Sequence, residues 1–213
     1  MNWTDKIQVY NEDCMETMAR YEDGWFDLAI VDPPYQGNDA INIKYVDESK
    51  FSAKRKIYKE FSNVKPNEEY FTELKRVSKN QIIWGGNYFG LIGGVIVWQK
   101  NGTAFGEGEI AICSTHNSVR FFEFTWNGML QGDMKNKEQR IHPTQKPVAL
   151  YNWILDRYAK PDFKIIDTHL GSGSHAISCH HYGCELVAAE LDTDYYNDSF
   201  KRFKLNTAQQ KLF

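Results

Sequence analysis

The chain has 213 residues, enough for one substantial hydrophobic core and too few for two full domains. Its 42% hydrophobic and 25% charged residues are typical of a soluble globular protein, and no apolar run is long enough to span a membrane. A net charge of −3 argues against a general nucleic-acid coat protein, although a local basic patch can still bind DNA. The first residues do not resemble a signal peptide, so we expect a cytoplasmic protein with reduced cysteines.

A short strand is predicted at residues 7–10, followed by an acidic turn that contains Asp13. An amphipathic helix over about 15–20 then leads into the next strand. Parallel strands present their carboxyl ends at one edge of a sheet, so Asp13 should lie there. We expect it to contact polar groups of a cofactor, to cap the helix, or to do both.

The apolar run 26–31 stops abruptly at Asp32-Pro33-Pro34-Tyr35. This pattern predicts a buried parallel strand that enters a rigid turn at the edge where open α/β sheets bind ligands. Since proline has no N–H, the carbonyls of Asp32 and Pro33 can stay free beside the Asp32 carboxylate and the Tyr35 ring. An exocyclic amino group of a nucleobase, a double donor on a ring that stacks, suits such a site. A plain strand-terminating turn is the alternative.

Periodicity fails between 36 and 65, where basic and aromatic side chains are interleaved. Seven Lys and Arg residues stand against four Asp and Glu residues, a local charge of +3. A long basic segment beside a base-sized pocket predicts phosphate contacts and closure over DNA, whereas a solvated loop is the alternative. The expected DNA contacts here are Lys44, Lys54, Arg55 and Lys56.

The middle of the chain predicts a helix over 67–77, with its apolar side chains on one face, and a strand at 81–84. Two further apolar runs, 94–100 and 109–114, are joined by a glycine-rich connection. No helix fits between them, so they should pair as an antiparallel hairpin.

Aromatic and basic side chains gather between 115 and 140 with little periodicity. This composition suits a short insertion that reads nucleic acid, with Arg120 and Lys135 as DNA contacts, whereas a loop with an aromatic staple is the competing interpretation. The segment is too short to fold alone. We therefore expect a single domain over 1–213, with a basic loop at 36–65 and a recognition insertion at 115–140.

A glycine loop follows the predicted strand that ends at Asp167, and a helix over about 175–182 follows the loop. Glycines let a ligand approach the backbone, and the helix N-terminus favours electron-rich groups. The next strand ends at Glu190, 17 residues after Gly173, where a carboxylate can accept from both ribose hydroxyls of an adenosine. No Gly-Lys-Ser/Thr follows, so the loop predicts a nucleoside cofactor and not a P-loop.

Three motifs occur in a fixed order: Asp-Pro-Pro-Tyr at 32–35, His-Pro-Thr-Gln-Lys-Pro at 142–147, and the glycine loop at 167–173. Together they resemble the S-adenosylmethionine-dependent DNA amino-methyltransferases, specifically the N6-adenine enzymes of the permuted β group. The resemblance spans nearly the whole chain. It implies a doubly wound, Rossmann-like α/β fold, circularly permuted, with a seven-stranded mixed sheet and the antiparallel hairpin at one edge.

The resemblance also implies methyl transfer from S-adenosylmethionine to N6 of an adenine flipped out of double-stranded DNA, without a metal. The expected catalytic residues are Asp32, Pro33, Pro34 and Tyr35. The residues expected to bind the cofactor are Asp13, Cys14, Asp32, Thr144, Lys146, Asp167, Leu170, Gly171, Ser172, Gly173, Glu190 and Leu191.

The cofactor loop departs from the family pattern Asp-Pro-Phe-x-Gly-Ser-Gly-Thr. Thr168, His169 and Ser174 replace its Pro, Phe and Thr, which leaves the backbone cradle intact but changes the aromatic packing near the methionine moiety. Asp32 favours adenine, because the N4-cytosine enzymes tend to have Ser-Pro-Pro-Tyr or Ser-Pro-Pro-Phe. Methylation of cytosine N4 and a nucleic-acid binder without catalysis are the alternative functions.

The chain closes on Gln-Gln-Lys-Leu-Phe, an apolar end where polar residues are usual. The spacing resembles the short peptides by which bacterial replication proteins dock on a sliding clamp. Gln209 would be the polar anchor, and Leu212 and Phe213 would fill an apolar pocket. Docking of this tail on its own domain is the alternative.

Overall fold

The computed structural model describes residues 1–35, 64–102, 106–127 and 130–208. Four expected DNA contacts, Lys44, Lys54, Arg55 and Lys56, lie outside these ranges. The expected clamp-binding residues Gln209, Leu212 and Phe213 lie outside them as well.

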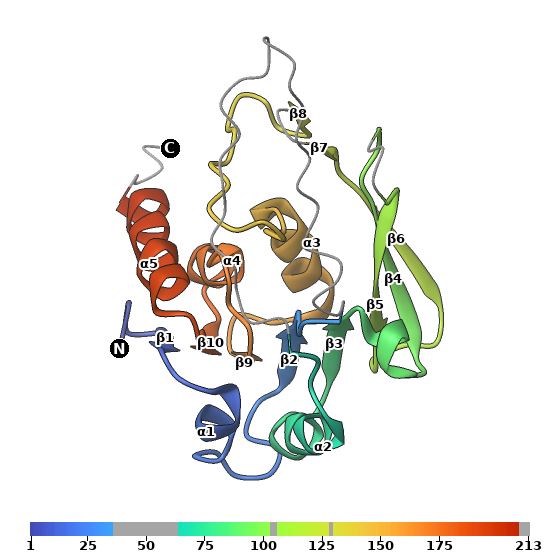
Figure 1. Ribbon diagram of the computed structural model, residues 1–213, viewed down its shortest axis with the longest axis vertical. Coiled ribbons are helices and arrows are strands. Elements are labelled where there is room, and N and C mark those ends of the chain that lie inside the picture. Colours follow the sequence, from blue (N-terminus) through green and yellow to red (C-terminus); the bar gives the residue numbers. More distant parts are fainter. Residues whose placement is uncertain (36–63, 103–105, 128–129, 209–213) are drawn as a thin grey trace.

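A mixed sheet runs through the described part of the chain in the order β1-β10-β9-β2-β3-β5-β4-β6 (Figure 1). Its strands are β1 (Ile7–Tyr10), β2 (Leu28–Val31), β3 (Gln81–Trp84), β4 (Gly94–Gln99), β5 (Gly108–Cys113), β6 (Val119–Glu123), β9 (Lys164–Asp167) and β10 (Glu185–Ala189). The strands from β1 to β3 in this order are parallel, β5 is antiparallel to β3 and β4, and β6 is parallel to β4. The expected fold class is confirmed, and strands from both ends of the chain share one sheet.

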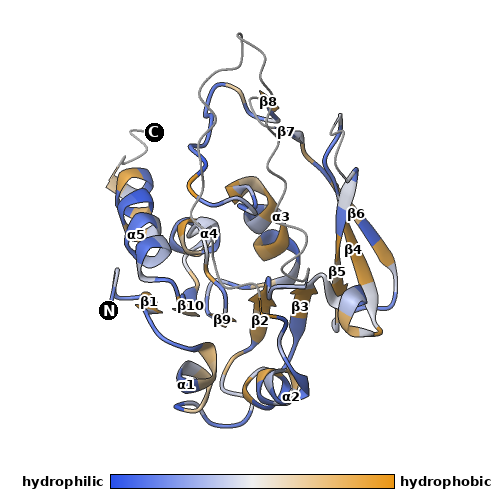
Figure 2. Cartoon of the chain, in the orientation of Figure 1, coloured by the Kyte–Doolittle hydropathy of each residue, from blue (hydrophilic) through white to orange (hydrophobic). Residues whose placement is uncertain are grey.

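Helices cover both faces of this sheet. The helices α1 (Cys14–Met18) and α2 (Glu68–Val77) lie on one face, and α3 (Val148–Tyr158), α4 (Ser174–Tyr182) and α5 (Thr193–Ala208) lie on the other (Figure 1). Side chains of β2 alternate between the two layers, because Leu28 and Ile30 pack with the α3 side and Ala29 and Val31 with the α1 side. Burial on both faces explains the uninterrupted apolar run that precedes Asp32 (Figure 2).

Capping and charged residues define the two ends of the helix α2. The side chain of Asn67 caps it by accepting from the backbone N of Tyr70 at 3.1 Å. Glu68 and Glu69 occupy its first turn, and basic residues occupy its last turn, as the helix dipole favours. Its buried side chains, Tyr70 among them, face the sheet. None of the helices in the described ranges has the length and apolar character needed to cross a bilayer.

The segment 115–140 is built differently from the expected insertion. Val119–Glu123 joins the sheet as an eighth strand, one more than expected, so the β4–β5 hairpin is not at the edge. The rings of Phe122 and Phe124 stack with their centroids 5.9 Å apart. Both pack against the core beside the buried Trp126, as an aromatic staple would. Beyond them lies the short ribbon of β7 (Trp126–Asn127) and β8 (Leu130–Gln131). The strand was missed because it is short and the adjacent Phe121 and Phe122 break the alternation of apolar and polar residues, and only Phe122 of its five residues is partly buried.

Candidate active site

A cavity of about 670 Å³ opens at the carboxyl ends of β1, β10, β9 and β2. The residues that follow each of these strands line it: Asp13 after β1, Glu190 after β10, Leu170 after β9 and Asp32 after β2. This edge is where open α/β sheets bind ligands, and the volume is within the range of small-molecule sites. Four segments that are far apart in sequence therefore form one site.

All four expected catalytic residues line this cavity, and so do most of the expected cofactor residues. Those that line it are Asp13, Cys14, Asp32, Thr144, Lys146, Leu170, Gly171, Ser172, Glu190 and Leu191. Asp167 and Gly173 do not. The Asp167 carboxylate lies behind the loop, where it accepts from the backbone N of His169 at 3.0 Å and from Nδ1 of His175 at 2.9 Å. It supports the loop from behind and does not face a ligand.

Glu190 is held against the glycine loop. Its Oε2 accepts from the backbone N of Gly171 at 2.7 Å, and its Oε1 accepts from the backbone N of Asp192 at 2.9 Å. Gly171 has a φ of 55°, the left-handed region that glycine tolerates best. Burial raises the pKa of the Glu190 carboxyl to about 7. Each oxygen keeps a lone pair, so the carboxylate can accept further hydrogen bonds from a diol.

Asp13 combines both expected roles. Its side chain caps α1 by accepting from the backbone N of Met15 at 2.8 Å, and it also lines the cavity. The neighbouring thiol of Cys14 is neutral, because burial raises its pKa to about 12. Besides Asp13, the carboxylates of Glu12, Glu190 and Asp192 line this end of the cavity, so it is rich in acceptors.

The opposite end is dense in charge. The Nζ of Lys146 lies 2.5 Å from Oδ2 of Asp32 and 2.9 Å from Oε2 of Glu109, and Lys100 also pairs with Glu109. Lys146 is 3% exposed and its ammonium lies over the Trp84 ring. The other oxygen of Asp32, Oδ1, is buried and accepts no hydrogen bond from any residue that the structure describes. It is the acceptor that remains for a ligand.

Burial and ion pairing oppose each other in this cluster. Burial raises the pKa of Asp32 although the Lys146 ammonium acts against it. Burial would also raise the pKa of Glu109, but Lys146 and Lys100 bring it below its usual value. Lys146 stays protonated despite burial, because Asp32 and Glu109 raise its pKa. Lys146, expected at the cofactor, lines the cavity, and its ammonium is paired with the Asp32 carboxylate.

The aromatic ring of Tyr35 is already stacked on one side. Its ring and that of Tyr88 lie 4.9 Å apart with an interplanar angle of 6°. Gly85 makes room for this ring, since a Cβ at Gly85 would lie 2.2 Å from Cδ1 of Tyr35. Gly85 and Tyr88 thus support the Tyr35 ring, which lines the cavity next to Asp32.

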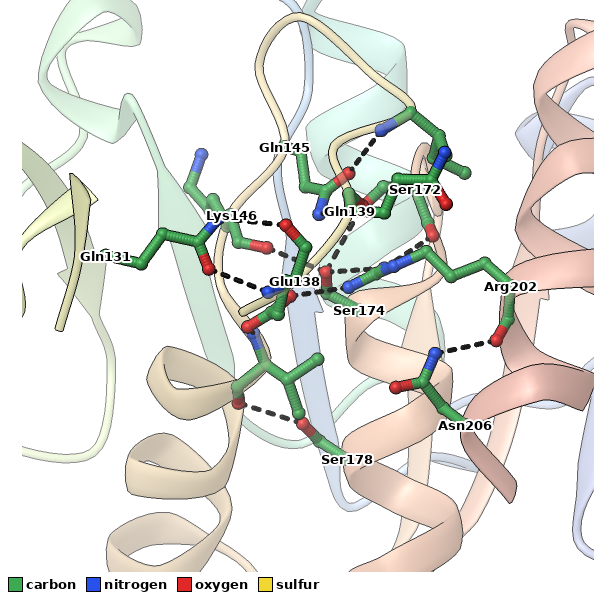
Figure 3. A network of polar contacts seen from close by, with 12 residues as sticks. Gln131, Glu138, Gln139, Gln145, Lys146, Ser172, Ser174, Ser178, Arg202 and Asn206 are labelled. Atoms are coloured by element: carbon green, nitrogen blue, oxygen red, sulfur yellow. Dashed lines mark hydrogen bonds and ion pairs between the residues drawn. The ribbon is translucent and has the colours of Figure 1, made fainter. Parts of the chain in front are cut away.

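A buried polar network links the cofactor loop to the segment that carries Lys146 (Figure 3). Arg202 of α5 donates to the carbonyl of Ser172 at 2.8 Å, to Oγ of Ser174 at 2.9 Å and to Oε2 of Glu138 at 2.6 Å. Oγ of Ser174 in turn donates to the carbonyl of Lys146 at 2.7 Å. The network fixes the position of the glycine loop relative to the Asp32 end of the cavity.

The two expected DNA contacts that the structure describes lie away from the cavity. Arg120 is exposed on the edge strand β6, and Lys135 is exposed after β8. Neither lines the site. Sequence reasoning also missed residues that line the cavity or support it, notably Tyr70, Tyr151 and, behind Lys146, Glu109. His169, noted in the sequence only as a departure from the family pattern, lines the cavity too. The signal for Glu109 was a single charge near the start of an apolar strand.

The comparisons with known proteins agree with this geometry. A family model described as DNA methylase, for N6 and N4 methyltransferases, matches residues 97–201. The type II methyltransferase M2.MboI of Moraxella bovis is 22% identical over 238 residues, which cover 92% of this chain and 87% of that protein.

Solved structures show the same fold. The complex of M1.HpyAVI with S-adenosylmethionine has a TM-score of 0.59 at 17% identity and covers 92% of this chain and 99% of its own. The cytosine-N4-specific PvuII DNA methyltransferase has a TM-score of 0.62 at 12% identity and covers 96% of this chain and 91% of its own.

The parallel strands, the glycine loop and the cavity at their carboxyl edge define an S-adenosylmethionine-dependent methyltransferase. Over residues 97–201 the chain is similar to the N6/N4 amino-methyltransferase family of DNA methylases, and S-adenosylmethionine is its cofactor.

Proposed function

We propose that this protein methylates the N6 amino group of adenine in double-stranded DNA. The observation that carries the proposal is the Asp32 carboxylate at the carboxyl edge of the sheet. One of its oxygens is held by Lys146, and the other is buried without a partner among the described residues. A buried acceptor of this kind is costly unless a donor from a ligand reaches it, and an exocyclic amino group is such a donor.

The other residues of the cavity suit S-adenosylmethionine. Glu190 would accept hydrogen bonds from the ribose hydroxyls of the cofactor. The backbone of the loop from Leu170 to Ser172 would lie against the cofactor. The cofactor supplies an activated methyl group, so the protein needs to supply orientation and electrostatics.

The protein's own contribution to transfer would come from Asp32 and Pro33. The carboxylate and the carbonyl would each accept one hydrogen of the amino group, which turns the nitrogen lone pair towards the methyl group. The Asp32 charge would also stabilise the positive charge that develops on the nitrogen. Lys146 holds this carboxylate in place, and its ammonium opposes the rise in the pKa of Asp32 that burial causes.

The target atom is inaccessible in a duplex, so the base has to be flipped out. A base stacked on Tyr35 must use the face that Tyr88 leaves free, or it must displace the half-exposed Tyr88 ring. The expected phosphate contacts within 36–65 and at Arg120 and Lys135 stay predictions. The comparisons give no support to the predicted clamp-binding tail.

Cytosine N4 is the second candidate, because the PvuII enzyme of similar fold is cytosine-N4-specific. Adenine and cytosine present the same kind of amino group, and the geometry of Asp32 accepts either. We favour adenine because the residue before the two prolines is Asp, where the cytosine enzymes tend to have Ser.

The test is transfer of a radiolabelled methyl group from S-adenosylmethionine to unmethylated duplex DNA, followed by digestion to nucleosides. Label in N6-methyladenine is the expected result. Label in N4-methylcytosine would show that the substrate is cytosine and not adenine. Binding of DNA without any transfer would overturn catalysis and favour a nucleic-acid binder.

A further inference from the structure

A chain of three hydrogen-bonding side chains lies under the cofactor cavity, at the position where this sequence departs from its family. The hydroxyl of Tyr70 lies 2.6 Å from Oγ1 of Thr168, and Oγ1 of Thr168 lies 2.9 Å from Nδ1 of His169. Tyr70 and Thr168 are 2% and 3% exposed, while His169 is partly exposed and lines the cavity. The chain therefore connects a buried tyrosine of α2 to an imidazole at the site.

Counting hydrogens fixes the direction of this chain. If Tyr70 donates to Thr168, and Thr168 donates to Nδ1 of His169, both hydroxyl hydrogens have acceptors. If Nδ1 of His169 donated to Thr168 instead, the single hydrogen of either Tyr70 or Thr168 would have no acceptor. No further partner of these two side chains exists in the described ranges, and a buried hydroxyl without an acceptor is costly. Nδ1 is then the acceptor, and in a neutral imidazole the hydrogen must be on Nε2.

The imidazole is neutral at physiological pH. Burial lowers the pKa of His169 to about 4, although the carboxylates of Asp167 and Asp13 act against this. Its ring also packs edge-on against the Tyr70 ring, with 5.6 Å between the ring centroids and an interplanar angle of 70°. Its backbone N donates to Oδ1 of Asp167. Nε2 makes no hydrogen bond with any group that the structure describes. His169 is thus a fixed single donor in the wall of the cavity.

The order of the strands indicates which part of the cofactor this donor meets. Glu190, the expected ribose acceptor, follows β10, and Asp32, where the methyl group must arrive, follows β2. His169 follows β9, which lies between these two strands. In S-adenosylmethionine the ribose, the reacting methyl and the amino-acid chain are three separate branches on the sulfonium sulfur. With the ribose at the β10 end and the methyl at the β2 end, the amino-acid chain is the branch left for the residue that follows β9. The carboxylate of this branch is the acceptor with the greatest affinity for an N–H donor.

We propose that Nε2–H of His169 donates a hydrogen bond to the methionine carboxylate of the cofactor, an inference that rests on the proposed cofactor site. Where relatives have phenylalanine and aromatic packing, this protein has a polar anchor whose tautomer is set by Thr168 and Tyr70. His169 is then a cofactor-binding residue, and Tyr70 and Thr168 are positioning residues that act through it.

Calorimetry with two ligands tests the contact. His169→Phe, which restores the family residue, should weaken binding of S-adenosylmethionine on the order of ten- to a hundredfold. It should leave 5′-methylthioadenosine, which lacks the amino-acid portion, nearly unaffected. His169→Gln, whose amide N–H can reach the place of Nε2–H, should keep most of the affinity. An equal effect of His169→Phe on both ligands, or on neither, would overturn the proposal.

Nitrogen-15 NMR of the full chain tests the tautomer without any ligand. The chain has six histidines, and the spectrum of His169→Phe identifies the signals of His169. We expect a protonated Nε2 and an unprotonated Nδ1 at pH 7; the opposite tautomer would contradict the proposal. If the wild-type protein bound neither ligand while its His169 had the expected tautomer, the proposed cofactor site would be wrong and not the internal chain of hydrogen bonds.

Discussion

The two ends of the cavity use opposite kinds of chemistry. At the β1 and β10 end, the groups that line the cavity are the carboxylates of Asp13 and Glu190, a neutral thiol and backbone amides, and burial raises the pKa of Glu190 to about 7. At the β2 end, two carboxylates and two ammonium groups are packed together, and Lys146 is shared between Asp32 and Glu109. The first end can bind a cofactor with small local adjustments. At the second end, removal of any one charge would leave a buried partner without its counter-charge.

The difference predicts that substitutions at the two ends fail in different ways. Loss of a charge at the β2 end leaves an uncompensated partner in a buried place, so both stability and turnover suffer. Loss of a group at the β10 end removes hydrogen bonds to a ligand, so affinity alone suffers. The predictions below test this contrast, starting with the largest expected effect.

Lys146→Met should have the largest effect, because Asp32 and Glu109 would face each other without the ammonium between them. Breaking a buried ion pair in this way costs about 3–5 kcal/mol of unfolding free energy. Without Lys146 the pKa of Asp32 should rise further, so the acid limb of the rate profile should move to higher pH. Chemical denaturation and a pH–rate profile measure both effects.

Lys201→Met is the matched control, since Lys201 has an exposed side chain and, among the described residues, pairs with the exposed Asp198. It should leave the melting temperature and the rate nearly unchanged. Equal stabilities of the two variants would show that the buried charges do not depend on one another.

Asp32→Ala should abolish most methyl transfer while cofactor binding stays intact. Removing one group aimed at charge in the transition state typically costs roughly 2.7–4 kcal/mol, or about a hundred- to a thousandfold in kcat. The cofactor dissociation constant should not change, because Glu190 and the glycine loop are at the other end of the cavity. Asp156→Ala, at an exposed position of α3, is the control. Retention of more than a tenth of the turnover would remove Asp32 from the transfer step.

These two variants also show how much of the site the sequence could predict. Asp32 and the glycine loop are contiguous motifs, each at the end of an apolar strand, so their place at one edge follows from the sheet alone. The pairing of Asp32 with Lys146 joins positions 114 residues apart, and Glu109 enters from a third strand. Side-chain partners of this kind depend on packing between elements, which periodicity does not record. The link from Tyr70 to His169 was hidden for the same reason.

Glu190→Gln should weaken cofactor binding and remove its pH dependence. The ribose hydroxyls would lose a charged acceptor, worth roughly 1.5–3 kcal/mol. In the wild type the carboxyl has a pKa of about 7, so lowering the pH through 7 protonates it and should weaken binding. The glutamine variant should show a flat profile. Glu185→Gln, exposed at the start of the same strand, should behave as wild type in calorimetry from pH 8 to pH 6. A wild-type affinity that does not fall with pH would show that Glu190 does not hold the ribose.

The smallest effects are expected at the two described DNA contacts, and they show whether the DNA surface extends beyond the cavity. Arg120 lies on β6, four strands from β2 in the sheet, or about 19 Å at the usual spacing between strands. Replacing Arg120 or Lys135 with Ala should each lower the salt dependence of DNA affinity by about 0.9 in slope, with little effect on turnover at saturating DNA. Lys164→Ala is the control, because Lys164 begins β9 at the amino ends of the parallel strands, opposite the cavity, and its ammonium lies over the Trp25 ring. If the salt dependence of DNA affinity is the same for Arg120→Ala and the control but lower for Lys135→Ala, then β6 does not contact DNA and only completes the sheet. The DNA would in that case lie over β7, β8 and the Asp32 end of the cavity.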